Sequence, residues 1–435
     1  MPAPTKRTLA TIGGSPAVAV AAAFLLRMFL LWLSHHGEDR TNPKFLTVGL
    51  EANLIAYSLA NGKGFFGPYP NYQSITAWLA PVYPFLWAVG NKLFNLTAFG
   101  ATIFSQVMNC VFSAATCWPI YGIGKKVFGG KVGLASAWLW VFLPYAVLLP
   151  LEWTWDQSLS ALMLAAILYV TYELIETDSP LAMTGYGLLW ALGALVNPTL
   201  CILLPILLGW LTIRRARPMW TSLATVAKVT LVFLLALAPW TIRNYYAVDG
   251  LVFVKSNFGL EFWLGNNPQV KEIYTPDRHP NRDMRERMAL IFNGEPAYNR
   301  YKQRQAIAYI RKYPRVFLRN VAARFVDTWT ANYDSRQETW ILALGLGRAD
   351  VWFCTVFSVV SFAGLIFATM EYWRESLPLA VCLLLFPIPY YITHTASRYR
   401  HPIDPVMTIL AVYFITRALR YFSIPAATPT LPAKA

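Results

Sequence analysis

Charged residues are scarce in this chain. Asp, Glu, Lys and Arg make up 14% of its 435 residues, whereas soluble globular proteins have about 25%. Hydrophobic residues make up 56%, and the mean hydropathy is +0.41. The 66 aromatic residues comprise 17 Trp, 23 Tyr and 26 Phe. This composition predicts an integral membrane protein with aromatic residues at the membrane surfaces.

Motifs for disulfides, zinc and nucleotides are also missing. The sequence has no Gly-rich phosphate loop opening a helix, no Walker motif and no dinucleotide fingerprint, which argues against a soluble nucleotide-binding domain. The cysteines lie in apolar stretches and form no CxxC pair, so neither a disulfide framework nor a zinc site is indicated. They are Cys110, Cys117, Cys201, Cys354 and Cys382.

The net charge is +15. Basic residues that flank membrane spans account for it better than nucleic-acid binding does, because anionic lipid headgroups attract them to the bilayer surface. We therefore expect membrane lipids as partners and no nucleic acid.

Ten stretches are long and apolar enough to suggest membrane crossings, each of which takes about 20 residues of helix. The sequence thus predicts an all-α integral membrane protein, a multi-pass helical bundle of about ten spans. The candidate spans are 15–34, 99–121, 132–150, 157–175, 182–196, 199–213, 222–241, 351–370, 377–395 and 403–422. Asn197 and Pro198 predict a tight turn between two of them, because proline disfavours helix in the preceding residue.

The segment 76–95 decides the topology. It is apolar but holds Pro81 and Pro84, and we expect it to lie outside, as an interfacial or re-entrant helix. The basic residues of the short loops, such as Lys125 and Arg214, then lie in the cytoplasm, as the positive-inside rule requires. Both chain termini are cytoplasmic in this threading. The alternative, in which 76–95 spans, inverts the rule.

This threading divides the chain into five parts. They are a cytoplasmic N-terminus (1–14), a transmembrane core (15–241) with a first outer loop (35–98), an extracytoplasmic loop or small domain (242–350), C-terminal spans (351–422) and a cytoplasmic tail (423–435). Apolar residues at helical spacing after Glu51 predict a helix on the membrane surface. An amphipathic helix is expected near 300–333.

Two acidic residues fall on the outer face. Glu51 opens the predicted surface helix, where a carboxylate can deprotonate a hydroxyl or hold a metal; the alternative is a solvated acid that interacts with the helix dipole. Asp156 lies at the outer mouth of the fourth span, where ionisable groups are costly and usually functional; the alternative is a helix cap. Glu152, one helical turn away, is a candidate supporting residue.

The last outer loop is basic and aromatic. Guanidinium groups at a membrane mouth suit phosphate recognition, and the alternative is plain interfacial anchoring. The candidate residues are Arg398 and Arg400, with Tyr399 and His401 in support. Glu261 and Asn266 are further supporting candidates, in a Gly/Asn/Pro-rich stretch that is also typical of an ordinary turn.

The order of these pieces resembles the GT-C superfamily of glycosyltransferases. The similar branch contains the dolichyl-phosphate-mannose–protein mannosyltransferases and the bacterial aminoarabinose transferases, and the resemblance covers the chain from about residue 15 to residue 420. The matching stretches are Glu51–Phe65, Thr76–Pro84, Tyr121–Gly129, the acidic mouth at Asp156, the Asn197-Pro198 turn and Arg398–Pro402.

The resemblance implies a GT-C bundle with extracytoplasmic juxtamembrane helices. It also implies transfer of a sugar from a polyprenyl-phosphate donor to an extracytoplasmic glycan, lipid or protein. Glu51 maps to the catalytic base or a metal-linked acid, Asp156 to the acid at the outer mouth, and Arg398 to a phosphate contact. The family often has an Asp-Glu pair in the first loop, whereas Leu50 precedes Glu51 here. The base assignment and a divalent metal, Mg or Mn, therefore stay open.

Two other functions compete with transfer. A lipid-linked sugar transporter or flippase is favoured by a charge inside a span, of which Arg27 is the clearest case, but no inverted repeat is found. A catalytically silent GT-C-like scaffold is favoured by the incomplete acid pair. We expect a multi-pass protein of the bacterial inner membrane with its site facing the periplasm.

Overall fold

The fold is helical throughout. The structure is a computed structural model, and it describes residues 14–42, 48–271, 273–332 and 347–422. Within those ranges, the β-type pairing consists of one isolated antiparallel bridge between Phe66 and Ile75. The predicted all-α class is confirmed.

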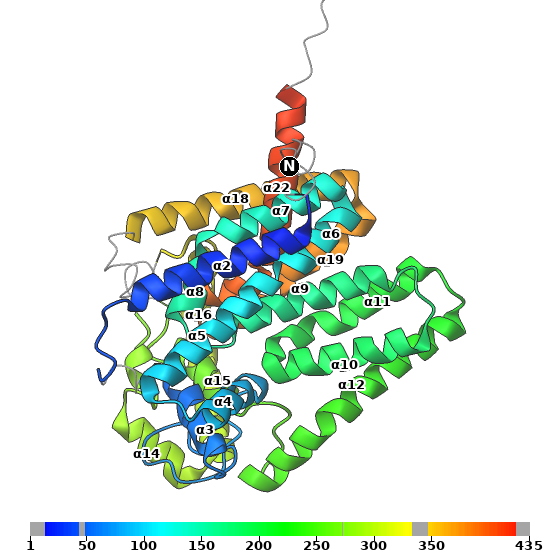
Figure 1. Ribbon diagram of the computed structural model, residues 1–435. Coiled ribbons are helices and arrows are strands. Elements are labelled where there is room, and N and C mark those ends of the chain that lie inside the picture. The colour runs from blue at the N-terminus through cyan, green and yellow to red at the C-terminus, as the bar shows by residue number, and fades with distance from the viewer. Residues whose placement is uncertain (1–13, 43–47, 272, 333–346, 423–435) are drawn as a thin grey trace, which may run out of the picture.

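The apolar helices form a bundle, with α2, α7, α9 and α18 running through its main body and α10, α11 and α12 grouped to one side (Figure 1). The N-terminal part of the bundle comprises α2 (Pro16–His35), α5 (Ala98–Ala115), α6 (Cys117–Phe128), α7 (Gly130–Phe142), α8 (Pro144–Glu152) and α9 (Gln157–Glu173). The side group comprises α10 (Pro180–Val196), η2 (Pro198–Leu203), α11 (Leu204–Arg215) and α12 (Met219–Val248). The C-terminal part comprises α18 (Gly347–Glu371), α19 (Trp373–Leu385), α20 (Ile388–Ile392), α21 (Ser397–Arg400), η5 (His401–Ile403) and α22 (Asp404–Phe422).

The remaining helices come from the two long loops, and α3, α4, α14 and α15 lie near one another at one end of the molecule, whereas α16 packs against α18 of the bundle (Figure 1). The first loop contributes α3 (Leu50–Ala60) and α4 (Val82–Phe94). The second contributes α13 (Phe258–Gly265), η3 (Pro276–Arg278), α14 (Met284–Asn293), α15 (Glu295–Lys312) and α16 (Pro314–Thr330).

The expected number of ten spans is not confirmed. Seven helices in the described residues are long and apolar enough to cross a membrane, or eight if the bent pair α7–α8 is one span. The expected spans 157–175 and 182–196 appear as α9 and α10, which have 17 residues each. A helix of that length is about 26 Å long, shorter than the roughly 30 Å hydrocarbon core.

Arg27 lies inside α2 and donates hydrogen bonds to backbone carbonyls at a break between two other helices. The helix axis bends by 42° between α7 and α8, where Pro144 has no N–H to donate to the carbonyl of Trp140. The Arg27 guanidinium donates instead to the carbonyls of Trp140 (3.2 Å), Val141 (3.4 Å) and Ala146 (3.0 Å). A carbonyl left unpaired inside a bilayer is costly, so this buried charge has a structural role and does not favour a transporter.

Glu295 joins the two long loops. Its buried carboxylate accepts hydrogen bonds from the Tyr72 hydroxyl (3.0 Å), the Thr76 hydroxyl, the Ala77 N–H (3.0 Å) and the Ser256 hydroxyl (2.7 Å). Tyr72 and Glu295 are 223 positions apart in the sequence. The α15 N-terminus is thereby fixed against the first outer loop.

Prolines shorten two of the helices that were expected from the sequence. The amphipathic helix expected near 300–333 is divided into α15 and α16 at Tyr313, because Pro314 opens a new helix. The segment 76–95 holds only the 13-residue α4, which is too short to cross a bilayer as a helix.

Candidate functional site

Glu51 lies in the first turn of α3, which follows a left-handed residue. Gly49 caps the helix with φ at +58°, a conformation that glycine adopts without strain. A Cβ at Gly49 would lie 2.4 Å from the Thr154 hydroxyl. The start of α3 is thus pressed against the segment that leads to Asp156, and this close approach brings the two outer elements together.

The Glu51 carboxylate is held by aromatic donors. Its side chain is 8% exposed. Oε1 accepts hydrogen bonds from the Tyr69 hydroxyl and from Trp78 Nε1 at 3.2 Å. His279 Nε2 lies 3.8 Å from the same oxygen. Burial, followed by the charge of Glu51, raises the pKa of Tyr69, so this phenol remains a hydrogen-bond donor at neutral pH.

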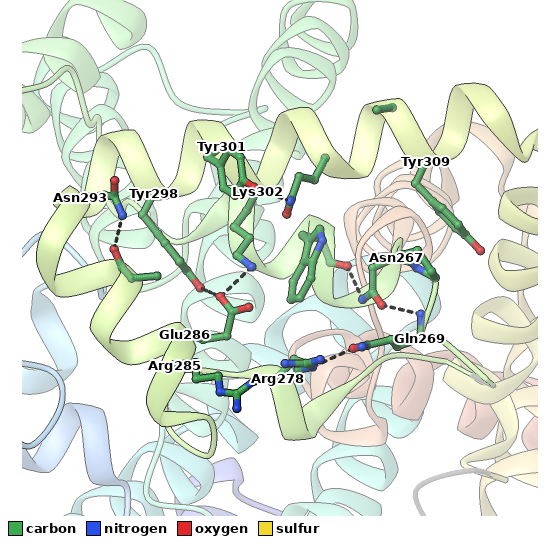
Figure 2. Close-up of a pocket in the computed structure, with 15 residues that line it drawn as sticks. Asn267, Gln269, Arg278, Arg285, Glu286, Asn293, Tyr298, Tyr301, Lys302 and Tyr309 are labelled. Carbon is green, nitrogen blue, oxygen red and sulfur yellow. Dashed lines mark hydrogen bonds and ion pairs between the residues drawn. The ribbon is translucent and has the colours of Figure 1, made fainter.

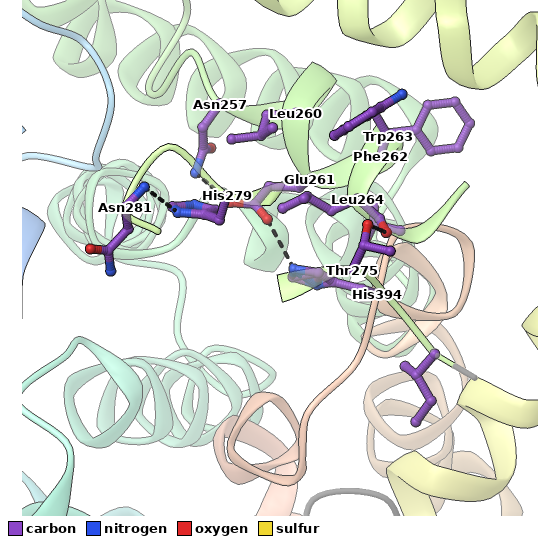
Figure 3. A network of polar contacts seen from close by, with 12 residues as sticks. Asn257, Leu260, Glu261, Phe262, Trp263, Leu264, Thr275, His279, Asn281 and His394 are labelled. Carbon is purple, nitrogen blue, oxygen red and sulfur yellow. Dashed lines mark hydrogen bonds and ion pairs between the residues drawn. The ribbon is translucent and has the colours of Figure 1, made fainter. Parts of the chain in front are cut away.

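Glu261 is a second carboxylate close to Glu51. His394 Nε2 lies 2.9 Å from its Oε2, and the Asn257 side chain donates to its Oε1 at 2.9 Å (Figure 3). Burial raises the pKa of Glu261; the negative charge of Glu51 also raises it, while the charges of His279 and of neighbouring cations lower it. The side chain comes from α13, in the long outer loop, and brings a second acid to the site from a distant part of the sequence.

His394 is a neutral partner of Glu261. Burial and the positive charges of Arg324, Arg398 and His279 lower the pKa of His394 to about 3. The imidazole is therefore uncharged at neutral pH and donates one N–H to Glu261, while Nδ1 is buried with no hydrogen-bond partner among the described residues. The ring stacks on Tyr399 with centroids 5.6 Å apart.

Asp156 is positioned through a short relay of hydrogen bonds. The Ser160 hydroxyl donates to Asp156 Oδ2 at 3.0 Å, and the Asn197 amide donates to that hydroxyl at 3.3 Å. The Asn197-Pro198 turn lies between α10 and η2, as expected from the sequence. Burial raises the pKa of Asp156, and the nearby charge of Lys255 opposes the rise. Lys255 also interacts with Glu261, so one cation faces both acids.

Arg398 completes the site from the last outer loop. Its guanidinium carbon lies 4.2 Å from the centre of the Trp153 ring and 5.0 Å from that of Tyr399. Such stacking holds a guanidinium in place, and guanidinium is the side-chain group whose donors match a phosphate. Arg398 also interacts electrostatically with Glu261. Four chain segments thus contribute to one polar centre.

Arg400 and His401 lie outside this centre, although they are neighbours of Arg398 in the sequence. Arg400 is 1% exposed and donates to Asp404 Oδ1 at 3.1 Å; His401 is fully buried and lies 3.0 Å from Asp404 Oδ2. The rings of His401 and Trp140 stack 5.5 Å apart. This ion-paired cluster anchors the start of α22, and the assignment of Arg400 to a donor phosphate is not supported by its position.

Two other supporting candidates also have different surroundings from those expected. Asn266 is 1% exposed, and its amide donates to the carbonyls of Phe262 and Ile392, both at 2.8 Å. It therefore ties α13 to the end of α20. Glu152 is exposed at the end of α8. Neither residue enters the site that we propose below, whereas Tyr399 does, through its stacking on His394.

Several residues of the site were not found from the sequence. Lys255, His279 and His394 each interact with Glu261, and Tyr69 binds Glu51. They lie in loops without hydrophobic periodicity, so no spacing marked them. The one available signal was the Gly/Asn/Pro-rich stretch around Glu261, which could equally have been a turn.

The residues present do not form a ready metal site. Within the described ranges, no group of three or more His, Cys, Asp or Glu side chains is placed to hold an ion. Glu51 Oε1 and both Glu261 oxygens already receive donors. We therefore derive no step through Mg or Mn.

Comparisons with known proteins agree with the resemblance found in the sequence. Residues 79–242 match the family described as dolichyl-phosphate-mannose-protein mannosyltransferase. The chain also superposes on an oligosaccharyltransferase of Archaeoglobus fulgidus. The apo form gives a TM-score of 0.54 at 13% identity, over 94% of this chain and 51% of that one. The chain has a GT-C architecture. No curated protein matches the sequence.

Other structures of the same archaeal enzyme contain bound groups. One, in complex with an inhibitory peptide and a dolichol-phosphate, gives a TM-score of 0.51 at 15% identity, over 95% of this chain and 52% of that one. Another, in complex with Zn and sulfate, gives 0.50 at 13% identity, over 93% of this chain and 49% of that one. The present chain spans about half the length of that enzyme, and at these identities the likeness establishes the fold.

Proposed function

We propose that this chain is a membrane glycosyltransferase that moves a sugar from a polyprenyl-phosphate donor to an extracytoplasmic acceptor. The observation that carries the proposal is the gathering of Glu51, Asp156, Glu261 and Arg398 from four chain segments. The family match and the GT-C architecture support it. The dolichol-phosphate bound to the archaeal neighbour supports a lipid-phosphate donor.

The protein must perform three functions in the reaction. The bond between the anomeric carbon and the phosphate oxygen breaks, and its electron pair leaves with the lipid phosphate. The acceptor oxygen or nitrogen forms the new bond to the anomeric carbon and loses its proton. The protein must therefore bind the phosphate, stabilise the negative charge on the leaving group and accept a proton.

The geometry suggests a residue for each of these functions. Arg398, held by Trp153 and Tyr399, is the phosphate ligand, and Lys255, which like Arg398 interacts with Glu261, adds a second positive charge to the site. Glu51 is the general base. Its carboxylate is fixed by the Tyr69 and Trp78 donors, which orient it without consuming its second oxygen.

Asp156 and Glu261 are the second acids of this site. The sequence has no acid beside Glu51 in the first loop, and Glu261 supplies one from the long outer loop instead. Asp156 lies at the mouth, where it can orient the acceptor or share the role of base. We propose that the long outer loop takes part in acceptor recognition, and that the protein lies in a bacterial inner membrane with this site facing the periplasm.

The test is sugar transfer by the purified chain in lipid nanodiscs, with a panel of radiolabelled polyprenyl-phosphate sugars. Release of label from the lipid carrier, faster with a mixed glycan, lipid and peptide acceptor pool, would support the transferase. A parallel assay in proteoliposomes follows movement of the same donors across the bilayer. Donor movement without cleavage would contradict the proposal and favour a flippase; donor binding with neither outcome would favour a silent scaffold.

A further inference from the structure

A pocket of about 790 Å³ lies within the long outer loop, separate from the polar centre (Figure 2). Helices α13, α14 and α15 build it. None of the proposed catalytic or phosphate-binding residues lines it. The two sites nevertheless share α13, because this helix carries Glu261 of the polar centre and Trp263 of the pocket wall. These two side chains are two positions apart and point to opposite sides of the helix, so the pocket lies across α13 from the polar centre.

The pocket floor is rigid. The ammonium group of Lys302 lies 3.5 Å from the centre of the Trp263 ring and 2.6 Å from Glu286 Oε2. The Tyr298 hydroxyl donates to the same carboxylate oxygen at 2.9 Å. The Lys302 and Glu286 side chains are only 5% and 14% exposed. The paired ammonium covers one face of the indole and fixes the ring in place, which reduces the entropy that this part of the wall loses when a ligand binds.

The upper wall offers aromatic surface and an unsatisfied amide. Tyr301 and Tyr309 line the pocket along α15 (Figure 2), and Tyr301 is 59% exposed. The Gln305 amide donates to the Tyr301 hydroxyl at 2.9 Å, whereas its Oε1 is buried and has no hydrogen-bond partner among the described residues. A buried acceptor left unpaired is costly, and a ligand hydroxyl can satisfy this one only if the Gln305 side chain turns toward the pocket.

The charge of the lining is positive. It holds Arg278, Arg285 and Lys302 against the single carboxylate of Glu286. Arg278 donates to the side chains of Asp283 and Gln269, whereas Arg285 is exposed at the rim. An anion would therefore meet the Arg285 guanidinium at the entrance, whereas the Lys302 ammonium below is already paired with Glu286.

We propose that this pocket binds a negatively charged sugar unit, one that carries a carboxylate or a phosphate. Flat aromatic rings pack against the C–H faces of a pyranose, and Arg285 binds the acidic group. Assigning this sugar to the acceptor rests on the proposed transferase function. The sugar-binding property itself does not.

The test measures binding first, with no donor present. The purified full-length chain in nanodiscs is titrated calorimetrically with trigalacturonate, with mannose 6-phosphate, and with galactotriose and mannose as neutral counterparts. The variants are Tyr301→Ala and Arg285→Gln. Tyr57→Ala is the matched control, because Tyr57 is 61% exposed on α3 and does not line the pocket.

At least one acidic sugar should bind about tenfold more tightly than its neutral counterpart, and Tyr301→Ala should weaken that binding about tenfold, as the loss of an aromatic anchor does. Arg285→Gln should remove the preference for the acidic sugar, and Tyr57→Ala should change nothing. Absence of binding by both acidic sugars, equal binding of acidic and neutral sugars, or wild-type affinity in Tyr301→Ala would overturn the proposal.

Binding and transfer can fail independently. If the acidic sugar binds, and the variants weaken binding as expected, but no donor is cleaved, the sugar-binding proposal is supported and the transferase proposal is contradicted. If transfer occurs, an acceptor that ends in the bound sugar should show a raised KM in Tyr301→Ala with kcat and donor affinity unchanged. A lowered kcat at unchanged acceptor KM would contradict the assignment of this pocket to the acceptor.

Discussion

Replacing Glu295 by Gln should loosen the first outer loop without unfolding the membrane bundle. In the native protein two donors, the hydroxyls of Tyr72 and Thr76, face Oε1, and two others, the Ala77 N–H and the Ser256 hydroxyl, face Oε2. An amide oxygen in place of Oε1 keeps the first two. An NH₂ group in place of Oε2 can still donate to the serine hydroxyl, which rotates.

The Ala77 N–H is the group that loses its acceptor. Its hydrogen bond to the carboxylate is 3.0 Å long, and a bond to a charged acceptor contributes about 1.5–3 kcal/mol. Local opening of the chain around Ala77 should therefore become roughly 10- to 100-fold more frequent, since 1.4 kcal/mol corresponds to about a factor of ten. Glu295→Ala removes all four acceptor contacts and should have a larger effect.

Hydrogen–deuterium exchange in nanodiscs measures this directly. Peptides that cover residues 65–80 should exchange faster in Glu295→Gln, while those from α18 and α22 keep their wild-type protection. Glu176→Gln is the control, because that carboxylate is 81% exposed and its contact with Lys126 is 3.7 Å long. Unchanged exchange at 65–80 in Glu295→Gln would refute the docking role of this residue.

Three further perturbations follow from the structure. Arg27→Met removes the donor to the Trp140 carbonyl, whereas the Ala146 carbonyl keeps the Ser113 hydroxyl. The melting temperature in detergent should therefore fall, and a wild-type value would contradict the structural role of Arg27. Arg398→Gln should raise the donor KM at least tenfold and leave the melting temperature at its wild-type value. Arg400→Gln leaves a buried acid without its cation, so it should destabilise the fold by about 3–5 kcal/mol and lower the melting temperature. The reverse pattern would contradict the positions of both arginines. Because burial raises the pKa of Asp156, this acid stays protonated to a higher pH than an ordinary aspartic acid. The acidic limb of the kcat/KM profile should therefore have its midpoint above about pH 4. A midpoint at or below that pH would contradict a role for ionised Asp156 in the reaction.

The helical class and the outer acids were accessible from the sequence because they depend on local signals. Apolar runs of about 20 residues predict membrane helices, and the proline after Asn197 predicts a turn. The expected number of spans is not confirmed, because apolar composition does not reveal where a helix ends. The 17-residue helices α9 and α10 are examples.

Long-range pairing was not accessible. Arg398 and Arg400 are two positions apart, so their side chains point to opposite sides of the short helix α21. Nothing in the sequence says which of them faces the site and which pairs with Asp404. Similarly, Arg27 could be read as a functional charge until its acceptors, the carbonyls of a broken helix more than 110 positions away, were known.

The sequence named Glu51, Asp156, Glu261 and Arg398 as candidates, but for the same reason it did not reveal the residues that pair with the first loop. Glu51 and Asp156 follow or precede apolar helices, and that position marked them as outer-mouth acids. His279 and Glu295 lie in a polar loop of roughly 110 residues, where single charged residues carry no periodic signal. Their contacts with the first loop depend on tertiary folding alone.

The most direct test of the central claim separates donor binding from chemistry in Glu51→Gln. The donor is the polyprenyl-phosphate sugar that wild type cleaves fastest. Its dissociation constant should stay within about threefold of wild type, while single-turnover transfer should fall by about 10²–10⁴-fold, the usual contribution of a general base. Transfer at the wild-type rate with intact binding would contradict the assignment of Glu51 as the base, and with it the proposed active centre.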